Sequence, residues 1–357
     1  MLFDFFILAF ICYGMIHLDR QANCLFGLLD VGGEGIWAID ACKEKKLRAP
    51  FKYRVLTFWI ARILKITSKK MHTIRIINGR TCDNVYCIDS TGSESYFVYK
   101  YILLFLANLS LYWYLSTMGL PSLLGCFIFN TLIALTYRDD KTDYLYESIF
   151  MSLFLTVLFS GANIFYLCLI VFLGALNRET AIFMPIIALF YLNVLSIALL
   201  GVFFAIGFSI PRYIYRAPID VIDAGYYSGF RFLTFNPIRN WRKSIWPHLK
   251  KRYIGAIIDK LEIHYKGQQI VPLFSGQPLE TYVKERFMHK FSVAIVFVIF
   301  MFLVLITGMK YSPVGHHYLL WISMLFIVCI SIPADIREIR VYVPVFSILV
   351  QTLLYIS

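Results

Sequence analysis

Apolar runs separated by short turns occupy most of this 357-residue chain, and they limit the folds that are open to it. The composition is 59% hydrophobic and 17% aromatic, with only 16% charged residues, whereas soluble domains carry about 25%. Within a bilayer, the backbone polar groups of such a run must be satisfied inside the run itself, which an α-helix achieves. The sequence therefore predicts an all-α polytopic membrane protein.

About nine or ten of these runs are expected to be transmembrane helices. The interval 181–210 is too long for one span and short for two, so we divide it near Asn193. No basic region precedes the first run and no small-residue cleavage site follows it, so we expect a retained helix rather than a signal peptide. The expected helices are 2–16, 97–118, 119–137, 145–160, 162–176, 181–193, 193–210, 291–309, 318–332 and 341–356.

Two long polar segments, 18–96 and 209–290, interrupt this single transmembrane domain of residues 1–357 and carry most of its formal net charge of +12. Span parity places both segments on the same face. Basic loops of a membrane protein favour anionic lipid headgroups or phosphates as neighbours. No basic stretch resembles a nucleic-acid-binding module, so we do not expect nucleic acid as a partner.

Part of the first polar segment is predicted to be an amphipathic helix. In 51–66, apolar residues recur at helical spacing, and basic residues stand between them. The interval is short and too rich in cations for a span, but it suits a helix that lies in the headgroup plane.

Three charged clusters interrupt or end apolar runs, at 138–143, 174–180 and 335–340. Span parity places all three on the face of the long loops. Arg178 is the strongest candidate, because a cation at membrane depth costs at least about 2.5–3.5 kcal/mol and normally has a partner. Its guanidinium could bind a phosphate bidentately, with Glu179 orienting it. The alternative is an ion pair of Arg178 with Glu179 or Asp140 that fixes helix packing.

The acids Asp139, Asp140 and Asp143 lie within about one helical turn. They could position an acceptor, bind a divalent cation such as Mg²⁺ or Mn²⁺, or supply a general base. The alternative is a solvated helix start, where acids are favourable. Arg337 and Arg340 are further candidate phosphate ligands. No cofactor is certain from the sequence.

The first loop contains three candidate catalytic acids, Asp30, Glu34 and Asp40, each of which could instead be a surface carboxylate. Four cysteines in apolar runs behave as small hydrophobic residues. Four others lie in the first loop and could pair in an oxidising compartment, with a connectivity that the sequence leaves open. The apolar set is Cys12, Cys126, Cys168 and Cys329, and the loop set is Cys24, Cys42, Cys82 and Cys87.

This pattern resembles the multi-pass GT-C glycosyltransferases, which take a sugar from a polyprenyl-phosphate carrier. The resemblance rests on an acidic loop after the first helix and on short motifs. These are Pro-Phe-Lys-Tyr-Arg-Val-Leu at 50–56, the acids of 139–143, Leu-Asn-Arg-Glu-Thr at 176–180 and Glu-Ile-Arg at 338–340. It implies juxtamembrane helices in the first loop and an extracytoplasmic active site in a bacterial or archaeal plasma membrane.

The resemblance also implies residue roles. An acid of the first loop, Asp30 or else Glu34 or Asp40, would activate the acceptor, which is a glycan, a lipid or a protein. Arg178 would hold the donor phosphate. Two other functions fit the same charges: an O-antigen-type polysaccharide polymerase, and a flippase or transporter of lipid-linked glycans. A closed chamber at one interface would favour an enzyme, whereas a midplane cavity between repeats would favour transport.

Overall fold

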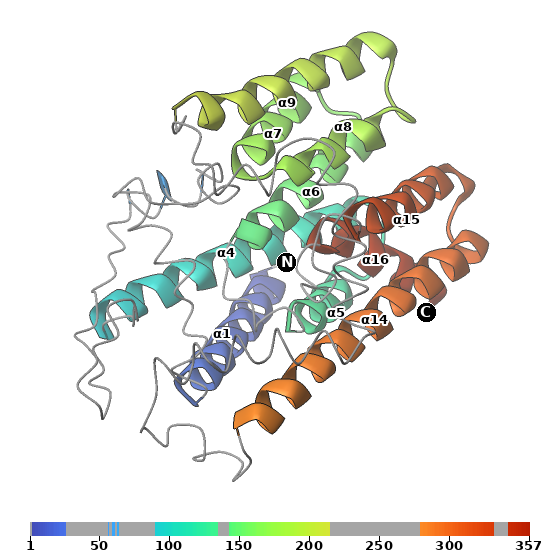
Figure 1. Cartoon of the computed structure of the whole chain (residues 1–357). Coiled ribbons are helices and arrows are strands. Elements are labelled where there is room, and N and C mark those ends of the chain that lie inside the picture. Colours follow the sequence, from blue (N-terminus) through green and yellow to red (C-terminus); the bar gives the residue numbers. More distant parts are fainter. Residues whose placement is uncertain are drawn as a thin grey trace.

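The computed structural model describes residues 2–25, 90–134, 143–214, 279–331 and 342–357, and Leu56, Trp59, Ile60 and Ile63. Of residues 2, 18–25, 90–97, 143, 212, 214 and 279–294 it describes the backbone alone. Ten α-helices and no strand occur in these described ranges (Figure 1). The helices are α1 (Leu2–Leu25), α4 (Ser90–Thr117), α5 (Ser122–Ala134), α6 (Asp143–Phe159), α7 (Ile164–Asn177), α8 (Phe183–Ala188), α9 (Val194–Ile214), α14 (Leu279–Tyr311), α15 (His317–Ser331) and α16 (Val343–Ile356).

The all-α prediction is confirmed for the described residues. Three segments are long and apolar enough to cross a membrane, namely Val98–Thr117, Val194–Pro211 and Val314–Ser331. The other apolar helices are shorter, at 10–17 residues. The chain is therefore a multi-pass membrane protein by helix length and composition, while a total of nine or ten spans stays a prediction.

Two glycine turns lie at boundaries between the predicted helices, and one break lies where the sequence predicts it. Gly119 and Gly161 have φ angles of 68° and 67°, a left-handed conformation that favours glycine. Asn163 then caps α7 by accepting a hydrogen bond from the Phe165 N–H at 2.9 Å. The break near Asn193 is also confirmed, since α8 ends at Ala188 and α9 begins at Val194.

Several helices are longer than the apolar runs that predicted them. Helix α1 continues to Leu25, α4 begins at Ser90 and α14 begins at Leu279, all within segments predicted as polar loops. Once a helix has started, each further residue adds a backbone hydrogen bond whether or not its side chain is apolar. The ends of an apolar run in the sequence therefore do not mark the ends of the helix.

The predicted span 181–193 is wrong as a span. A 3₁₀ turn, η2 (Glu179–Ile182), leads into α8, which is only six residues long. Six helical residues extend about 9 Å, far less than the hydrocarbon core of about 30 Å. The ring of Tyr191, beyond α8, lies 5.2 Å from that of Phe159, just before α7. The chain thus returns to the end of the bundle from which α7 started.

One end of the helix bundle is closed by aromatic side chains from five elements, and we call it the aromatic end. Its members are Tyr114 of α4, Phe159 of α6, Tyr191 after α8, His316 of the 3₁₀ turn η3 (Val314–His316) and Tyr355 of α16. The opposite end, which we call the loop end, includes the C-terminus of α7 and the N-termini of α6 and α16. The segments 135–142 and 332–341 come directly before the loop-end N-termini of α6 and α16 in the sequence. They contain predicted site residues and lie outside the described residues.

Close backbone contact joins the helices on one side of the bundle, where α7, α8 and α9 group together (Figure 1). A Cβ atom at Gly207 of α9 would lie 2.6 Å from the Phe172 carbonyl oxygen of α7. Elsewhere, the amide of Asn108 in α4 donates to Asn130 of α5 at 3.3 Å, and Asn130 donates back at 2.7 Å. Reciprocal amide bonds of this kind hold helices together in an apolar environment.

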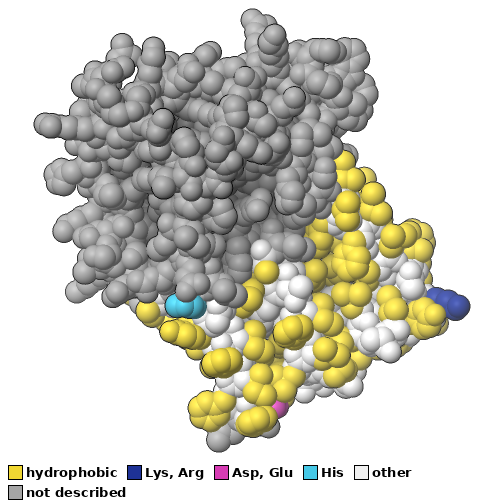
Figure 2. All heavy atoms as spheres, turned by 90° about the horizontal axis from the view of Figure 1, so that it is seen from below, with side chains coloured by type: hydrophobic (Ala, Val, Ile, Leu, Met, Phe, Trp, Pro, Cys, Tyr) yellow, Lys and Arg dark blue, Asp and Glu magenta, His cyan; other side chains and the backbone are white. Residues whose placement is uncertain are grey.

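The outer surface of the described helices suits a lipid environment. Figure 2 shows a face on which hydrophobic side chains dominate the described part and charged side chains lie only at its edge. The span in α9 is the least buried of the three, with 17% of its residues inside the protein. Apolar patches of this extent are unusual on soluble monomers, so membrane contact explains them.

Candidate functional site

The candidate site is built around a break in the helical chain at Arg178. Helix α7 ends at Asn177, and Arg178 adopts an extended backbone with φ −154° and ψ 152°. The break stays hydrogen-bonded, because the Arg178 N–H donates to the Gly174 carbonyl at 2.9 Å and its own carbonyl accepts from Ala181 at 3.2 Å. Non-helical backbone at membrane depth is tolerated only where protein or a water-filled cavity surrounds it.

Arg178 forms a buried ion pair with Glu147 of α6. The distance from Nη1 to Oε2 is 2.8 Å, and each side chain is 6% exposed. The other carboxylate oxygen of Glu147 accepts a hydrogen bond from the Thr180 hydroxyl of η2. Glu147 therefore ties α6 to both sides of the break, and each charge compensates the other where either alone would be costly.

The pair lies inside the helix bundle, nearer the loop end than the aromatic end. Along α6, Glu147 is about 18 Å from Phe159 at the aromatic end, at 1.5 Å per residue. Arg178 is about 21 Å from the start of α7 by the same measure. Glu147 and Arg178 therefore lie at similar distances from the aromatic end of the bundle.

Two other helix ends, the N-termini of α16 and α6, lie near this ion pair. Each follows a charged segment in the sequence. A cavity of about 10 Å³, roughly the size of one water molecule, is lined by Glu147, Thr180 and Pro344 among others. Pro344 stands in the first turn of α16, directly after the segment that contains Arg337 and Arg340. Glu147 stands one turn after Asp143, where the acidic cluster 139–143 ends. The helix ends that flank all three clusters thus converge.

A buried lysine that the sequence analysis missed lies at a similar level. Lys100 of α4 is 0% exposed. Its neighbour Tyr99 shares a 2.6 Å hydroxyl–hydroxyl bond with Tyr146, the residue before Glu147. The parallel helices α4 and α6 therefore present Lys100 and Glu147 at comparable depth. The signal was available, because Lys100 is the only charged residue in the apolar run 97–118.

Glu147 was also missed, although it is the described partner of Arg178. The sequence suggested Glu179 or Asp140 for that role. Glu179 is half-buried in η2. Glu147 is the only charged residue in the run 145–160. Since isolated charges in membrane segments usually pair, this pattern could have identified the pair.

Most other predicted site residues lie outside the described residues. These are Asp30, Glu34, Asp40, Asp139, Asp140, Arg337 and Arg340, and the side chain of Asp143. No group of three or more potential metal ligands occurs among the residues that the structure describes. The expected divalent cation depends on Asp139, Asp140 and Asp143, so it stays a prediction.

The described cysteines are all free thiols. Cys12, Cys126 and Cys168 are buried, as expected of small hydrophobic residues, whereas Cys329 is exposed on α15. The side chains of the four loop cysteines fall outside the described residues.

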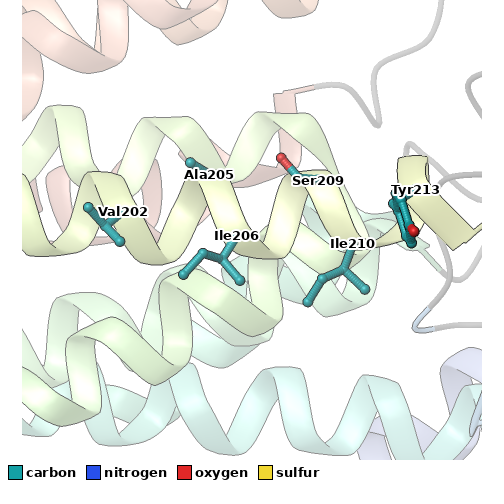
Figure 3. A pocket seen from close by; sticks show the side chains of 6 residues that line it. All are labelled: Val202, Ala205, Ile206, Ser209, Ile210 and Tyr213. Carbon is teal, nitrogen blue, oxygen red and sulfur yellow. The ribbon is translucent and has the colours of Figure 1, made fainter.

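A larger cavity of about 660 Å³ lies along α9 (Figure 3). Its described lining is Val202, Ala205, Ile206, Ser209, Ile210 and Tyr213. No charged side chain occurs in that described lining. The ion pair is the stronger candidate for chemistry.

These observations define a multi-pass membrane protein whose helices enclose an ion pair at a helix break. Comparison with family models, with curated proteins and with solved structures finds no match. The function must therefore be inferred from the site itself.

Proposed function

We propose that this chain is a membrane glycosyltransferase that moves a sugar from a polyprenyl-phosphate carrier to an extracytoplasmic glycan, lipid or protein acceptor. The observation that carries the proposal is the convergence of the helix ends beside all three charged clusters on the Glu147–Arg178 pair. A site for a lipid-borne phosphate needs cations near the membrane boundary, and the sequence puts Arg337 and Arg340 just before one of these helix ends.

In the proposed mechanism, Arg178 stabilises the leaving phosphate. Negative charge grows on that phosphate as the glycosidic bond breaks. A guanidinium already held in place by Glu147 lowers the barrier, because it does not have to reorganise during the reaction. Arg337 and Arg340 would add further contacts to the phosphate.

The remaining roles fall to the loop-end acids. Asp30, or else Glu34 or Asp40, would remove the proton from the acceptor hydroxyl. Asp139, Asp140 and Asp143 would position the acceptor, or a divalent cation if one is required. Glu179, next to Arg178, would help to orient the guanidinium.

The described residues of the first loop support its juxtamembrane placement. Leu56, Trp59, Ile60 and Ile63 are helical. Leu56 and Ile60 pack against the helix core, whereas Ile63 is 76% exposed. Partial burial of the apolar residues Leu56 and Ile60 against the bundle is expected of an amphipathic helix beside a membrane.

A transporter of lipid-linked glycans is the second candidate, and one observation favours it. The α7–η2–α8 segment is a broken helix with a charge at membrane depth, as in the discontinuous helices of many transporters. A polysaccharide polymerase of the O-antigen type would use the same cations on a lipid-linked glycan. Chemistry on the lipid separates the enzymes from the transporter.

The test is a transfer assay with the purified full-length protein in nanodiscs. Polyprenyl-phosphate hexoses and pentoses are supplied as donors and a lipid and glycan extract as acceptor, and release of free polyprenyl phosphate is measured. We expect release by the wild type and a loss of at least about tenfold in Arg178→Lys, which keeps the charge but not the planar fork. Lys310→Gln, at the exposed end of α14 away from the site, should match the wild type.

Three outcomes bear against the proposal. No release with any donor would contradict sugar transfer, and full activity in Arg178→Lys would remove Arg178 from the mechanism. Movement of intact lipid-linked glycan between leaflets without release would establish the transporter. Growth of a glycan from lipid diphosphate donors alone would establish the polymerase.

A further inference from the structure

The aromatic end contains a hydrogen-bonded chain that the proposed function does not use. The Tyr114 hydroxyl of α4 donates to Oε1 of Gln351 in α16 at 2.5 Å. Nε2 of Gln351 lies 3.2 Å from Nδ1 of His316 in η3. An amide nitrogen can only donate, so Nδ1 of His316 is the acceptor and the imidazole is neutral. The chain therefore has a fixed direction, from Tyr114 to His316.

Proton uptake by His316 is incompatible with this direction. A proton on Nδ1 would face the amide NH₂ group of Gln351, donor against donor. If the amide turned to present its oxygen to His316, the Tyr114 hydroxyl would lose its acceptor. Tyr114 is 0% exposed and Gln351 is 2% exposed, so water does not replace that acceptor, and a buried donor without a partner is costly.

The surrounding groups do not offset a charge on His316. Those described around it are Tyr114 of α4, Tyr191 after α8, Tyr355 of α16 and the adjacent His317. No carboxylate, and so no ion-pair partner for a protonated His316, occurs among these described groups. Nε2 of His317 lies 3.3 Å from the Ser312 carbonyl, so it takes no part in the chain.

We propose that the Tyr114–Gln351–His316 chain is a proton-operated latch that holds η3 against α4 and α16, and that opens when the compartment at the aromatic end becomes acidic. Turn η3 is also tied to the segment after α8, because Tyr191 donates to the Gly315 carbonyl at 2.9 Å. Opening the latch therefore loosens the contact between the α8–α9 turn and the start of α15. The latch does not depend on sugar transfer.

The experiment is hydrogen exchange of the full-length protein in nanodiscs at pH 7.5 and 5.5, corrected for the intrinsic effect of pH. The peptide of residues 309–318 reports on the turn, through the amides of Ser312 and His316, which are hydrogen-bonded at 2.8 Å. In the wild type we expect protection to fall about tenfold at pH 5.5. His316→Gln should remove this dependence on pH, and the control His317→Gln should keep it.

Two variants test the direction of the chain. Tyr114→Phe lets the amide turn toward a protonated His316 without stranding a hydroxyl, so the fall in protection should disappear. Gln351→Glu offers oxygens to both neighbours, so protection should become higher at pH 5.5 than at pH 7.5. Equal protection of the wild type at the two pH values would overturn the latch. The latch would also be overturned if protection in Tyr114→Phe or His316→Gln fell at pH 5.5 as much as in the wild type. Absence of this fall in His317→Gln would overturn it too.

Discussion

Replacing Arg178 with methionine should destabilise the protein by about 3–5 kcal/mol, because it removes one partner of a buried, hydrogen-bonded ion pair. Methionine retains an unbranched side chain, so the loss reports mainly on the charge. Glu147 is 6% exposed, and Thr180 would be its remaining described hydrogen-bond donor. The double variant Glu147→Gln/Arg178→Met removes both charges of the pair, and glutamine can still accept from Thr180. We therefore expect it to recover most of the loss.

The assay is equilibrium unfolding of the full-length protein in detergent micelles, followed by tryptophan fluorescence for the wild type, both single variants and the double variant. A double-mutant cycle should give a coupling energy of at least about 2 kcal/mol between the two sites. Lys310→Met, an exposed charge on the aromatic-end side, should change stability by less than about 0.5 kcal/mol. Additive single effects, or an Arg178→Met variant as stable as the wild type, would refute a buried ion pair.

Three further predictions concern packing and topology. Gly207→Val should destabilise the α7–α9 contact by about 1–3 kcal/mol, because the valine side chain would meet a backbone carbonyl of α7. Thermal unfolding would measure this loss, and an unchanged melting temperature would contradict the close approach of the two helices. Asn108→Leu should cost about 1–2 kcal/mol by removing the reciprocal hydrogen bonds between the two amides, although Asn130 keeps its bond to the Cys126 carbonyl. Asn108→Leu/Asn130→Leu should cost less than the sum of its single variants. Cysteines introduced singly at Ala162 and Val314, in a background without the loop cysteines, should react with an impermeant maleimide from the same side of the membrane, since both residues are exposed at the aromatic end; labelling from opposite sides would contradict the fold.

Local features of the fold were predictable because they depend on short stretches of chain. The positions of the apolar helices follow from hydrophobicity, and the turns at Gly119 and Gly161 follow from backbone freedom. The helix extensions were not predictable in the same way. The first turns of α14, which begins at Leu279, contain many polar residues. The helical hydrogen bonds nevertheless continue through them.

The site was only half predictable. Arg178 stood out because a cation within an apolar run needs a partner, but the described partner, Glu147, is on another helix. A search for oppositely charged residues that stand alone in apolar runs would have suggested Glu147, and it would also have found Lys100. This pattern could not have shown which of the charged residues contact one another, because the contacts depend on how each helix is rotated and how deep it lies.

The amino-acid sequence by itself determined that this protein is helical and membrane-embedded, where its main turns fall, and that its apolar runs contain charges in need of partners. Each of these properties belongs to a segment, because hydration and backbone hydrogen bonding act locally. Only the tertiary structure decided that Glu147 meets Arg178 at a helix break and that Gln351 links Tyr114 to His316. Such contacts depend on the packing of whole helices against one another, and no single segment specifies that packing.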